Sequence, residues 1–290
     1  MPDAPRITPL DATLGAVVED VRLRSLDDGT WATIEAAFLR HALLIFPGQH
    51  LTDAEQTAFA SRFGPIERIV AGADTIPISN RFRDGTPLAA DHYSTRIQQG
   101  NEGWHTDSSY MPLAAKASVL SARVVPSAGG GTEWADMRAA HDALDPATRE
   151  RIAGLSAHHS IYHSQAQIGH EVESGAGYGF HDEGAPLRPL VKVHPETGRS
   201  ALFIGRHAHS IPGWSPEASR ALLAELLDGA CRPPRTHEHR WAPGDVVVWD
   251  NRCVLHRARP YDRSEARTMH HTRISGDPAS ELAPTSPTVR

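Results

Sequence analysis

The sequence has few cysteines, no long hydrophobic run and no excess of basic residues. The two cysteines, Cys231 and Cys253, form neither a disulfide framework nor a cysteine-based zinc motif. No apolar run approaches the roughly 20 residues that a membrane-spanning helix needs. Lys and Arg number 29 against 35 Asp and Glu, which gives a formal net charge of −6. We therefore expect a protein that binds neither membranes nor nucleic acid.

The printed sequence also begins without the pattern of a secretory signal, because no charged segment followed by an apolar stretch comes after Met1. Two thiols without a disulfide framework suit a reducing compartment, so we expect a cytoplasmic protein. Its expected partners are a small-molecule substrate and further copies of itself in a homo-oligomer.

Apolar residues are sufficient for a large core, since 40% of the chain is hydrophobic and 22% is charged. The 23 glycines and 22 prolines separate many short apolar segments. This pattern favours a mainly β fold with α insertions, a sandwich or jelly roll, over a doubly wound α/β fold. We expect a single domain over residues 1–276. The Pro/Ser/Thr-rich residues 277–290 predict a disordered C-terminal tail.

Local patterns predict one well-defined helix start and two long loops. Residues 52–55 (TDAE) have the pattern of a capping box, which predicts a helix to about Phe63. Residues 81–103 and 156–186 show no regular periodicity. Irregular segments of that length in a compact domain are usually lids or disordered segments.

Histidine is unusually abundant, with 18 residues. His105 and Asp107 are two positions apart, so on a strand their side chains point to the same face and can share a metal ion. This spacing alone carries little weight, because a chain so rich in His and acidic residues also contains it by chance.

Two downstream residues complete a candidate site. His256 follows a predicted hydrophobic strand, and Arg267 lies at the start of another. Two His and one carboxylate on a β scaffold are the donor set of the non-haem Fe(II) oxygenases, which leaves positions for two oxygens of 2-oxoglutarate and for O₂. The fork of Arg267 suits the distal carboxylate of that cosubstrate. A zinc hydrolase with the same ligands and a non-catalytic binding jelly roll are alternatives, although neither needs a dicarboxylate anchor.

Longer motifs around these residues resemble a known family. Residues 104–110 (WHTDSSY) and 249–257 (WDNRCVLHR) resemble the taurine/2,4-D, or TauD/TfdA, dioxygenase family. Within that family the chain is most similar to the aryloxyalkanoate dioxygenases that act on (S)-phenoxypropionates such as dichlorprop. Four further segments carry this closer resemblance: residues 41–50, 62–69, 188–199 and 204–213.

The resemblance implies a double-stranded β-helix, which is a jelly roll, and an Fe(II)- and 2-oxoglutarate-dependent dioxygenase. In this chemistry O₂ converts 2-oxoglutarate to succinate and CO₂, and the carbon α to an ether oxygen is hydroxylated. The product of an aryloxyalkanoate then collapses to a phenol and an α-keto acid. The same chemistry on taurine or an alkyl sulfate is the alternative within the family.

The resemblance also implies roles for individual residues. The Fe(II) ligands are the two histidines and the aspartate named above, and Arg267 binds the distal carboxylate. Thr132 matches a threonine that assists this carboxylate, and Trp249 matches a tryptophan that lines the same pocket. Asn101 matches a position that contacts the substrate. Arg273 shares strand parity with Arg267 and is a second candidate substrate contact, with a structural ion pair as the alternative.

Three neighbouring residues keep open roles. Arg206 is a candidate either for a substrate carboxylate or for a surface salt bridge. His207 and His209 have the spacing of a second metal pair, a pattern of little weight in this chain.

Overall fold

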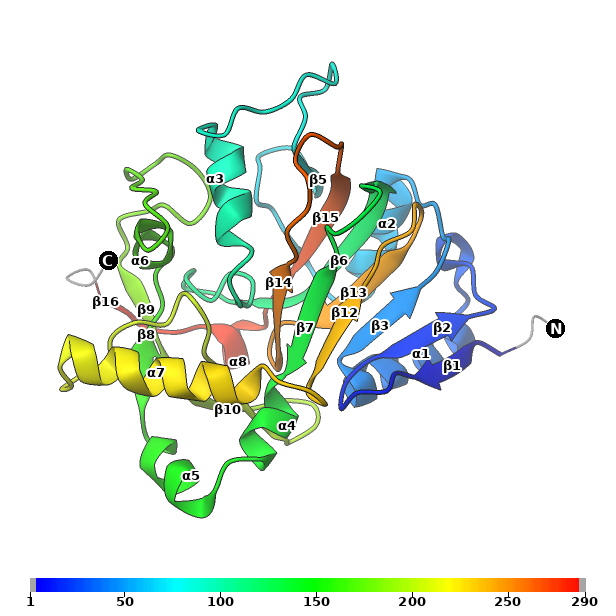
Figure 1. Cartoon of the computed structure of the whole chain (residues 1–290). Coiled ribbons are helices and arrows are strands. Elements are labelled where there is room, and N and C mark those ends of the chain that lie inside the picture. The colour runs from blue at the N-terminus through cyan, green and yellow to red at the C-terminus, as the bar shows by residue number, and fades with distance from the viewer. Residues whose placement is uncertain (1–3, 287–290) are drawn as a thin grey trace.

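The computed structural model describes residues 4–286, in which the strands form one large sheet and three small ones (Figure 1). Only the β2–β3 pair within the large sheet is parallel, so the sheet is mixed. In spatial order the large sheet contains β1 (Arg6–Pro9), β2 (Ala16–Glu19), β3 (Leu43–Phe46), β13 (Val246–Asp250), β6 (Ala115–Val124), β15 (Thr268–Ser275) and β4 (Ile66–Glu67), with β5 (Thr75–Ser79) also paired to β15.

The three small sheets come from later parts of the chain. The sheet that matters most for the site contains β12 (Thr236–His239), β7 (Thr132–Asp136) and β14 (Val254–Ala258). The other two contain β16 (Thr285–Ser286), β9 (Ala185–Pro189) and β8 (Ser156–His158), and β10 (Val191–Val193) with β11 (Ser200–Leu202).

Helices surround these sheets, and the capping box predicted at residues 52–55 is confirmed. The Thr52 hydroxyl accepts from the Glu55 backbone N–H at 3.2 Å, and the Glu55 carboxylate accepts from the Thr52 N–H at 2.8 Å. The helices are η1 (Leu23–Ser25), α1 (Asp28–His41), α2 (Asp53–Ser61), α3 (Tyr93–Gly100), α4 (Met137–Asp142), α5 (Pro146–Ile152), α6 (Ile161–Ala166), α7 (Pro216–Ala230) and α8 (Pro278–Glu281).

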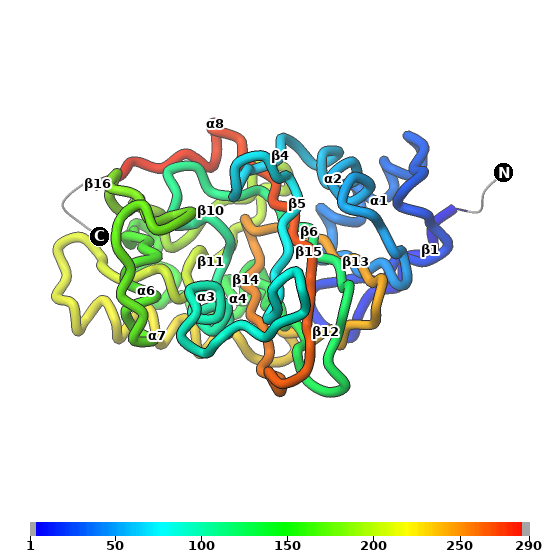
Figure 2. The backbone as a smooth tube through the Cα atoms, turned by 90° about the horizontal axis from the view of Figure 1, so that it is seen from above, coloured from blue at the N-terminus to red at the C-terminus, as the bar shows by residue number. Residues whose placement is uncertain are grey.

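The central strands of the large sheet are buried on both faces, which explains their continuous apolar sequence. Leu44 and Phe46 of β3 face α1 and α2 in one hydrophobic cluster. Leu43 and Ile45 face the opposite cluster, which also contains Trp134 of β7. The large sheet is therefore the middle layer between two helices and the β7–β14 sheet, and α3 and α6 lie at the end far from α1 (Figure 2).

The two segments predicted to be long loops contain regular structure, so this prediction is wrong in part. Residues 81–103 include α3, and residues 156–186 include β8, α6 and the start of β9. The sequence of α3 is mostly polar, and the helix is supported by a cap in which the Ser94 N–H donates to His92 Nδ1 at 3.1 Å and by packing against α6. Tertiary contacts of this kind override local propensity.

The prediction of a disordered tail over residues 277–290 is wrong for residues 277–286, which form α8 and β16; residues 287–290 lie outside the described part. Glu281 is 1% exposed and forms an ion pair with Lys192. Its backbone carbonyl accepts from Arg188 at 3.0 Å. These residues supply partners to the buried Arg188 and to the partly buried Lys192, which composition alone does not reveal.

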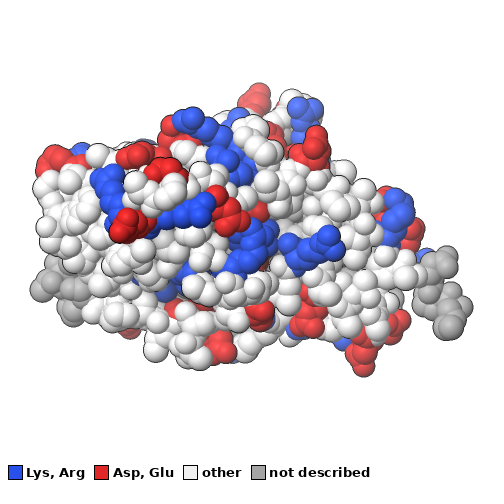
Figure 3. Space-filling model, turned by 90° about the horizontal axis from the view of Figure 1, so that it is seen from below, with Lys and Arg blue, Asp and Glu red and all other residues white. Residues whose placement is uncertain are grey.

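Among the described residues, no helix combines the length and apolar character needed to cross a membrane. The face seen in Figure 3 carries Lys and Arg side chains with Asp and Glu side chains beside them. Charges of both signs therefore lie on this face.

Candidate active site

Two pockets meet at the face of the large sheet formed by β5 and β15, one toward the β7–β14 sheet and the other toward α3 and α6. The Arg267 pocket is lined by Thr132, Trp249 and Arg267 among others. The Arg206 pocket is lined by Arg206 and by many apolar side chains. Both pockets share a set of lining residues: Ile78, Gln98, Asn101, His105, Asp107, His271 and Arg273. A ligand in either pocket therefore reaches the same histidine and carboxylate groups.

His105, Asp107 and His256 are brought together as the sequence predicted. His105 pairs with His256 of β14 in an isolated antiparallel bridge, with N–H···O distances of 2.9 and 2.7 Å in the two directions. Residues directly opposite in an antiparallel pair carry their side chains on the same face. Asp107 lies two positions after His105, and the ligand atoms of the three residues all lie within 4.8 Å of one another.

Both histidines are in the neutral form that binds a metal. Burial lowers the pKa of His105 to about 4 and lowers the pKa of His256 well below its usual range. His105 Nδ1 lies 2.8 Å from the Gly103 carbonyl oxygen, which assigns the proton to Nδ1 and leaves the Nε2 lone pair for a cation. His256 Nε2 lies 3.9 Å from Asp107 Oδ2, so the two groups face a common point.

Asp107 is held in place by the large sheet. Ser118 of β6 donates to Oδ2 at 2.6 Å, and Arg273 of β15 donates to Oδ1 at 2.9 Å. Ser118 and Arg273 are directly opposite in the β6–β15 register, so their side chains lie on the same face. Burial alone would raise the pKa of the Asp107 carboxyl, but the adjacent Arg273 guanidinium holds this pKa well below its usual range. The carboxylate is thus ionised and oriented.

Asn251 supports the loop that carries Asp107, and sequence reasoning did not assign it a role. Its side-chain oxygen accepts from the Asp107 N–H (3.3 Å) and from Trp249 Nε1 (2.9 Å), and its Nδ2 donates to Ser118 Oγ (2.9 Å). One side chain therefore joins the loop carrying Asp107 to β13 and β6. Asn251 lies inside the motif 249–257, but the sequence gives no indication of which residues its amide contacts.

The donor set fits a divalent transition-metal ion. Two neutral imidazoles and one carboxylate, on one side of a shared point, are the ligands of the non-haem iron oxygenases. The hydrogen bonds to Asp107 from Ser118 and Arg273 are the kind of supporting contacts that orient metal ligands.

The Arg267 pocket contains the three residues expected there. Arg267 Nε donates to the Gly130 carbonyl at 2.9 Å, and its guanidinium lies 5.7 Å from the Tyr261 ring centroid, but within residues 4–286 it forms no ion pair with Asp or Glu. Thr132 Oγ1 accepts from Trp241 Nε1 at 3.0 Å, which fixes the hydroxyl beside the pocket. Trp249 packs on His256, with ring centroids 4.6 Å apart. A buried unpaired guanidinium next to a hydroxyl suits an anionic ligand.

The two expected substrate contacts differ in their surroundings. Asn101 caps the end of α3 and lines both pockets. Arg273 also lines both pockets, but it is already committed to Asp107 and donates to Ser108 Oγ at 2.9 Å. The structure therefore favours the ion-pair alternative for Arg273, in which the arginine positions the carboxylate of Asp107.

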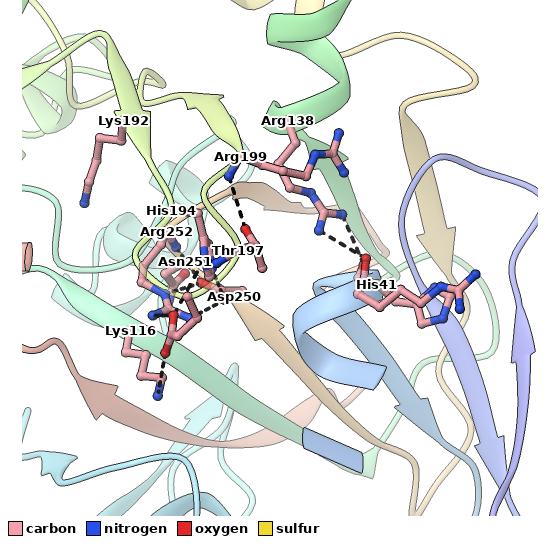
Figure 4. A network of polar contacts seen from close by, with 12 residues as sticks. His41, Lys116, Arg138, Lys192, His194, Thr197, Arg199, Asp250, Asn251 and Arg252 are labelled. Atoms are coloured by element: carbon pink, nitrogen blue, oxygen red, sulfur yellow. Dashed lines mark hydrogen bonds and ion pairs between the residues drawn. The ribbon is translucent and has the colours of Figure 1, made fainter. Parts of the chain in front are cut away.

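A second group of donors, His194, Asp250 and Cys253, has ligand atoms within 4.8 Å of one another. Figure 4 shows the surrounding network, in which Arg252 and His194 both lie against Asp250. Arg252 Nη2 donates to Asp250 at 2.6 Å, and burial raises the pKa of the Cys253 thiol well above its usual range. A protonated thiol beside an arginine–carboxylate pair is a poor metal site. The hydrogen bonds from His194 and Arg252 to Asp250 instead hold the turn that carries Asn251.

His207 and His209 do not form a metal group within residues 4–286. His207 Nδ1 lies 2.8 Å from Ser164 Oγ, and its ring contacts Tyr110 with centroids 4.8 Å apart. The His209 ring stacks on His163 with centroids 4.6 Å apart. Both histidines have packing and hydrogen-bonding roles.

This combination of a β scaffold and a buried two-histidine, one-carboxylate centre defines the class of mononuclear non-haem iron oxygenases. Residues 6–274 match the family model described as "Taurine catabolism dioxygenase TauD, TfdA family". The chain belongs to this TauD/TfdA family.

Individual relatives extend over nearly the whole chain. The sequence is 54% identical to the (S)-phenoxypropionate/alpha-ketoglutarate-dioxygenase of Sphingobium herbicidovorans, over 96% of this chain and 97% of that protein. It is 39% identical to the alpha-ketoglutarate-dependent 2,4-dichlorophenoxyacetate dioxygenase of Cupriavidus pinatubonensis, over 93% and 97%. The fold is similar to the crystal structure of AAD-2 in complex with Mn(II) and N-oxalylglycine, with a TM-score of 0.88, 37% identity and coverage of 97% and 99%.

Proposed function

We propose that this protein is an Fe(II)- and 2-oxoglutarate-dependent dioxygenase that cleaves the ether bond of aryloxyalkanoates. One O₂ and one 2-oxoglutarate are consumed for each aryloxy acid, and the products are a phenol, an α-keto acid, succinate and CO₂. The observation that carries this proposal is the meeting of two chemically different pockets at one metal-ligand group. The names of the 54% identical relatives give the substrate class.

We assign the Fe(II) ligands to His105, Asp107 and His256. The carboxylate of Asp107 is ionised and the two imidazoles are neutral, which are the forms that bind a cation. The bound metal would supply the oxidising chemistry with O₂. Arg267 and Thr132 would hold the distal carboxylate of 2-oxoglutarate, because this guanidinium and hydroxyl face a pocket that contains no acidic partner for Arg267 within residues 4–286. Trp249 would form a wall of that pocket.

The Arg206 pocket would hold the aryloxy acid. An aromatic ring needs an apolar enclosure, and this pocket provides one mainly from aliphatic and tyrosine side chains: Ile69, Val70, Ile76, Ile78, Tyr93, Ile97, Tyr110, Ile161 and Tyr178. Enclosure on this side excludes water from the reacting carbon while the site is occupied. Asn101 lies where both pockets meet and would contact the substrate there.

We also infer that the large sheet and the β7–β14 sheet form a double-stranded β-helix within a single domain over residues 1–276. The support is that Trp134 of β7 and Leu43 of β3 belong to one hydrophobic cluster that fills the space between the two sheets. We expect one cooperative transition in calorimetry, with equal calorimetric and van't Hoff enthalpies. Two resolved transitions would contradict a single domain.

The proposed reaction predicts a preference between enantiomers. With metal, 2-oxoglutarate and O₂ present, we expect faster phenol release from (S)-dichlorprop than from (R)-dichlorprop. If the carboxylate and the ring are both fixed, exchanging methyl and hydrogen at the α-carbon points a methyl group at the metal. A misplacement of about 1 Å can reduce the rate by about 10²-fold.

Resolved enantiomers should be assayed for both phenol and succinate. Faster release from the (R) form would contradict the stereochemical prediction. Succinate formation driven by taurine or an alkyl sulfate, without phenol from either enantiomer, would contradict the substrate class. Turnover that needs neither O₂ nor 2-oxoglutarate would instead favour the zinc hydrolase alternative.

A further inference from the structure

The chain neighbours of the two site histidines contact each other outside the pockets. His105 and His256 are directly opposite in an antiparallel bridge, and both line the Arg267 pocket. Successive side chains on a strand point to opposite faces, so Trp104 and Arg257 point away from this pocket. The Arg257 guanidinium carbon lies 4.5 Å from the centroid of the Trp104 ring. The tryptophan and the arginine are therefore stacked behind the two histidines.

A carboxylate on β7 holds this arginine from a second side. Glu133 is directly opposite Arg257 in the β7–β14 register, and the two strands lie side by side in Figure 1. Its Oε2 accepts from Arg257 Nε at 2.8 Å and lies 2.8 Å from Nη2. A second arginine, Arg259, donates to the same oxygen at 3.4 Å. Arg257 is thus held by an ion pair with Glu133 and by its position over the Trp104 ring.

The backbone pairing that joins the two histidines is short. β14 pairs with β7 over five residues, from Val254 to Ala258, but its contact with residue 105 is one isolated bridge. The His105 and His256 rings nevertheless have centroids only 4.1 Å apart. Few backbone hydrogen bonds resist a displacement at such a bridge. Side-chain contacts across it therefore contribute to the spacing of the two imidazoles.

We propose that Trp104, Arg257 and Glu133 are positioning residues that hold His105 and His256 at the spacing a metal ion requires. This inference rests on the ligand assignment of the proposed function. Trp104 and Arg257 are each one peptide bond from a ligand, so a loss of their contact moves the ligand strands relative to each other. Residues that orient metal ligands from behind typically contribute about 10–100-fold in metal affinity.

Charge and position predict opposite effects when this arginine is removed. Arg257 is a cation near a cation site, so by charge alone its loss would strengthen metal binding. If Arg257 instead positions the histidines, its loss weakens metal binding even though a repulsion is removed. The direction of the change therefore identifies the role of this residue.

The test measures the Kd of Mn(II) for Arg257→Met by calorimetry on chelator-treated protein, without turnover. Methionine keeps an unbranched apolar stem but removes both the charge and the planar group. We expect the Kd of Mn(II) to rise by about 10–100-fold.

The chain offers a matched control on the α1–α2 side of the large sheet. Arg62 lies over the Trp31 ring at 5.1 Å and pairs with Asp28 at 2.8 Å. Its side chain is 29% exposed, against 28% for Arg257. Arg62→Met therefore removes the same kind of contact away from the histidines, and it should leave the Kd of Mn(II) unchanged.

A second variant, Arg257→Lys, keeps the charge and remains informative if Arg257→Met does not fold. An ammonium group lacks the planar fork that stacks on a ring and pairs with a carboxylate at the same time. Arg257→Lys should therefore also weaken Mn(II) binding. A wild-type Kd in this variant would overturn the proposal.

The remaining outcomes separate the positioning role from the ligand assignment. An unchanged or lower Kd in Arg257→Met would overturn the positioning role, and so would an equal rise in Arg62→Met. His105→Ala tests the assignment itself, because it should abolish the Mn(II) binding that wild-type protein shows. If His105→Ala binds Mn(II) like wild type, the assignment fails and the positioning role fails with it. If His105→Ala loses binding while the Arg257 variants keep it, the positioning role alone is wrong.

Discussion

Replacing Asp107 with alanine should abolish turnover and also lower the free energy of unfolding. Turnover is lost because the centre loses its carboxylate ligand. Stability is lost because Arg273 is 7% exposed and donates to Asp107 at 2.9 Å, so the substitution leaves a buried guanidinium without its principal counter-ion. Removing one partner of a buried ion pair typically costs about 3–5 kcal/mol.

The measurements are O₂ uptake with 2-oxoglutarate and aryloxy acid, and urea unfolding in the presence of a chelator, so that bound metal does not contribute to stability. His105→Ala is the matched comparison, because it removes a ligand but retains the Asp107–Arg273 pair. It should lose turnover with a smaller loss of stability. Uptake close to wild type in either variant would refute the ligand assignment, and an unchanged unfolding energy in Asp107→Ala would refute the role of Arg273.

Replacing Arg267 with glutamine should raise the KM for 2-oxoglutarate strongly and leave the KM for the aryloxy acid nearly unchanged. Arg267 is buried, its Nε is fixed by the Gly130 carbonyl, and it has no acidic partner within residues 4–286. Truncation of one member of a buried charge-assisted pair costs about 2–5 kcal/mol, or at least about 30-fold in affinity.

Succinate formation should be measured while each substrate is varied in turn. Direct titration of Mn(II)-loaded protein with N-oxalylglycine gives the same answer without turnover. Arg220→Gln is the charge control on the surface of α7. An unchanged requirement for 2-oxoglutarate would place the anchor elsewhere, and a parallel rise for both substrates would indicate a general distortion of the site.

Several parts of the site could be predicted from the sequence because they depend on local chemistry. The His105/Asp107 spacing and His256 identify a donor set, since few residue types bind a metal in this combination. Thr52 and Glu55 satisfy each other within one helical turn, so their capping box needs no tertiary information. The continuous apolar run at residues 43–46 is likewise a local pattern that suits a strand buried on both faces.

Other parts depended on which segments meet in space. Strand parity places Arg273 on the face of the site. Only the register of β15 against β6 places Arg273 beside Ser118. The hydrogen bond from Arg273 to Asp107 shows that the charge of this arginine is already balanced. The stacking of Arg257 on Trp104 is visible only once the neighbouring histidines pair across their bridge.

What the sequence by itself determined is therefore the family and the class of reaction, and it also predicted the ligand types and the proposed anchor at Arg267. Only the tertiary structure decided which charged side chains pair with one another. Glu281 becomes the buried partner of Lys192 and orders residues 277–286, contrary to their composition. The physical reason is that the partner of a buried ion is set by long-range packing. Electrostatic stabilisation depends on distance and burial, and neither quantity is encoded in local residue patterns.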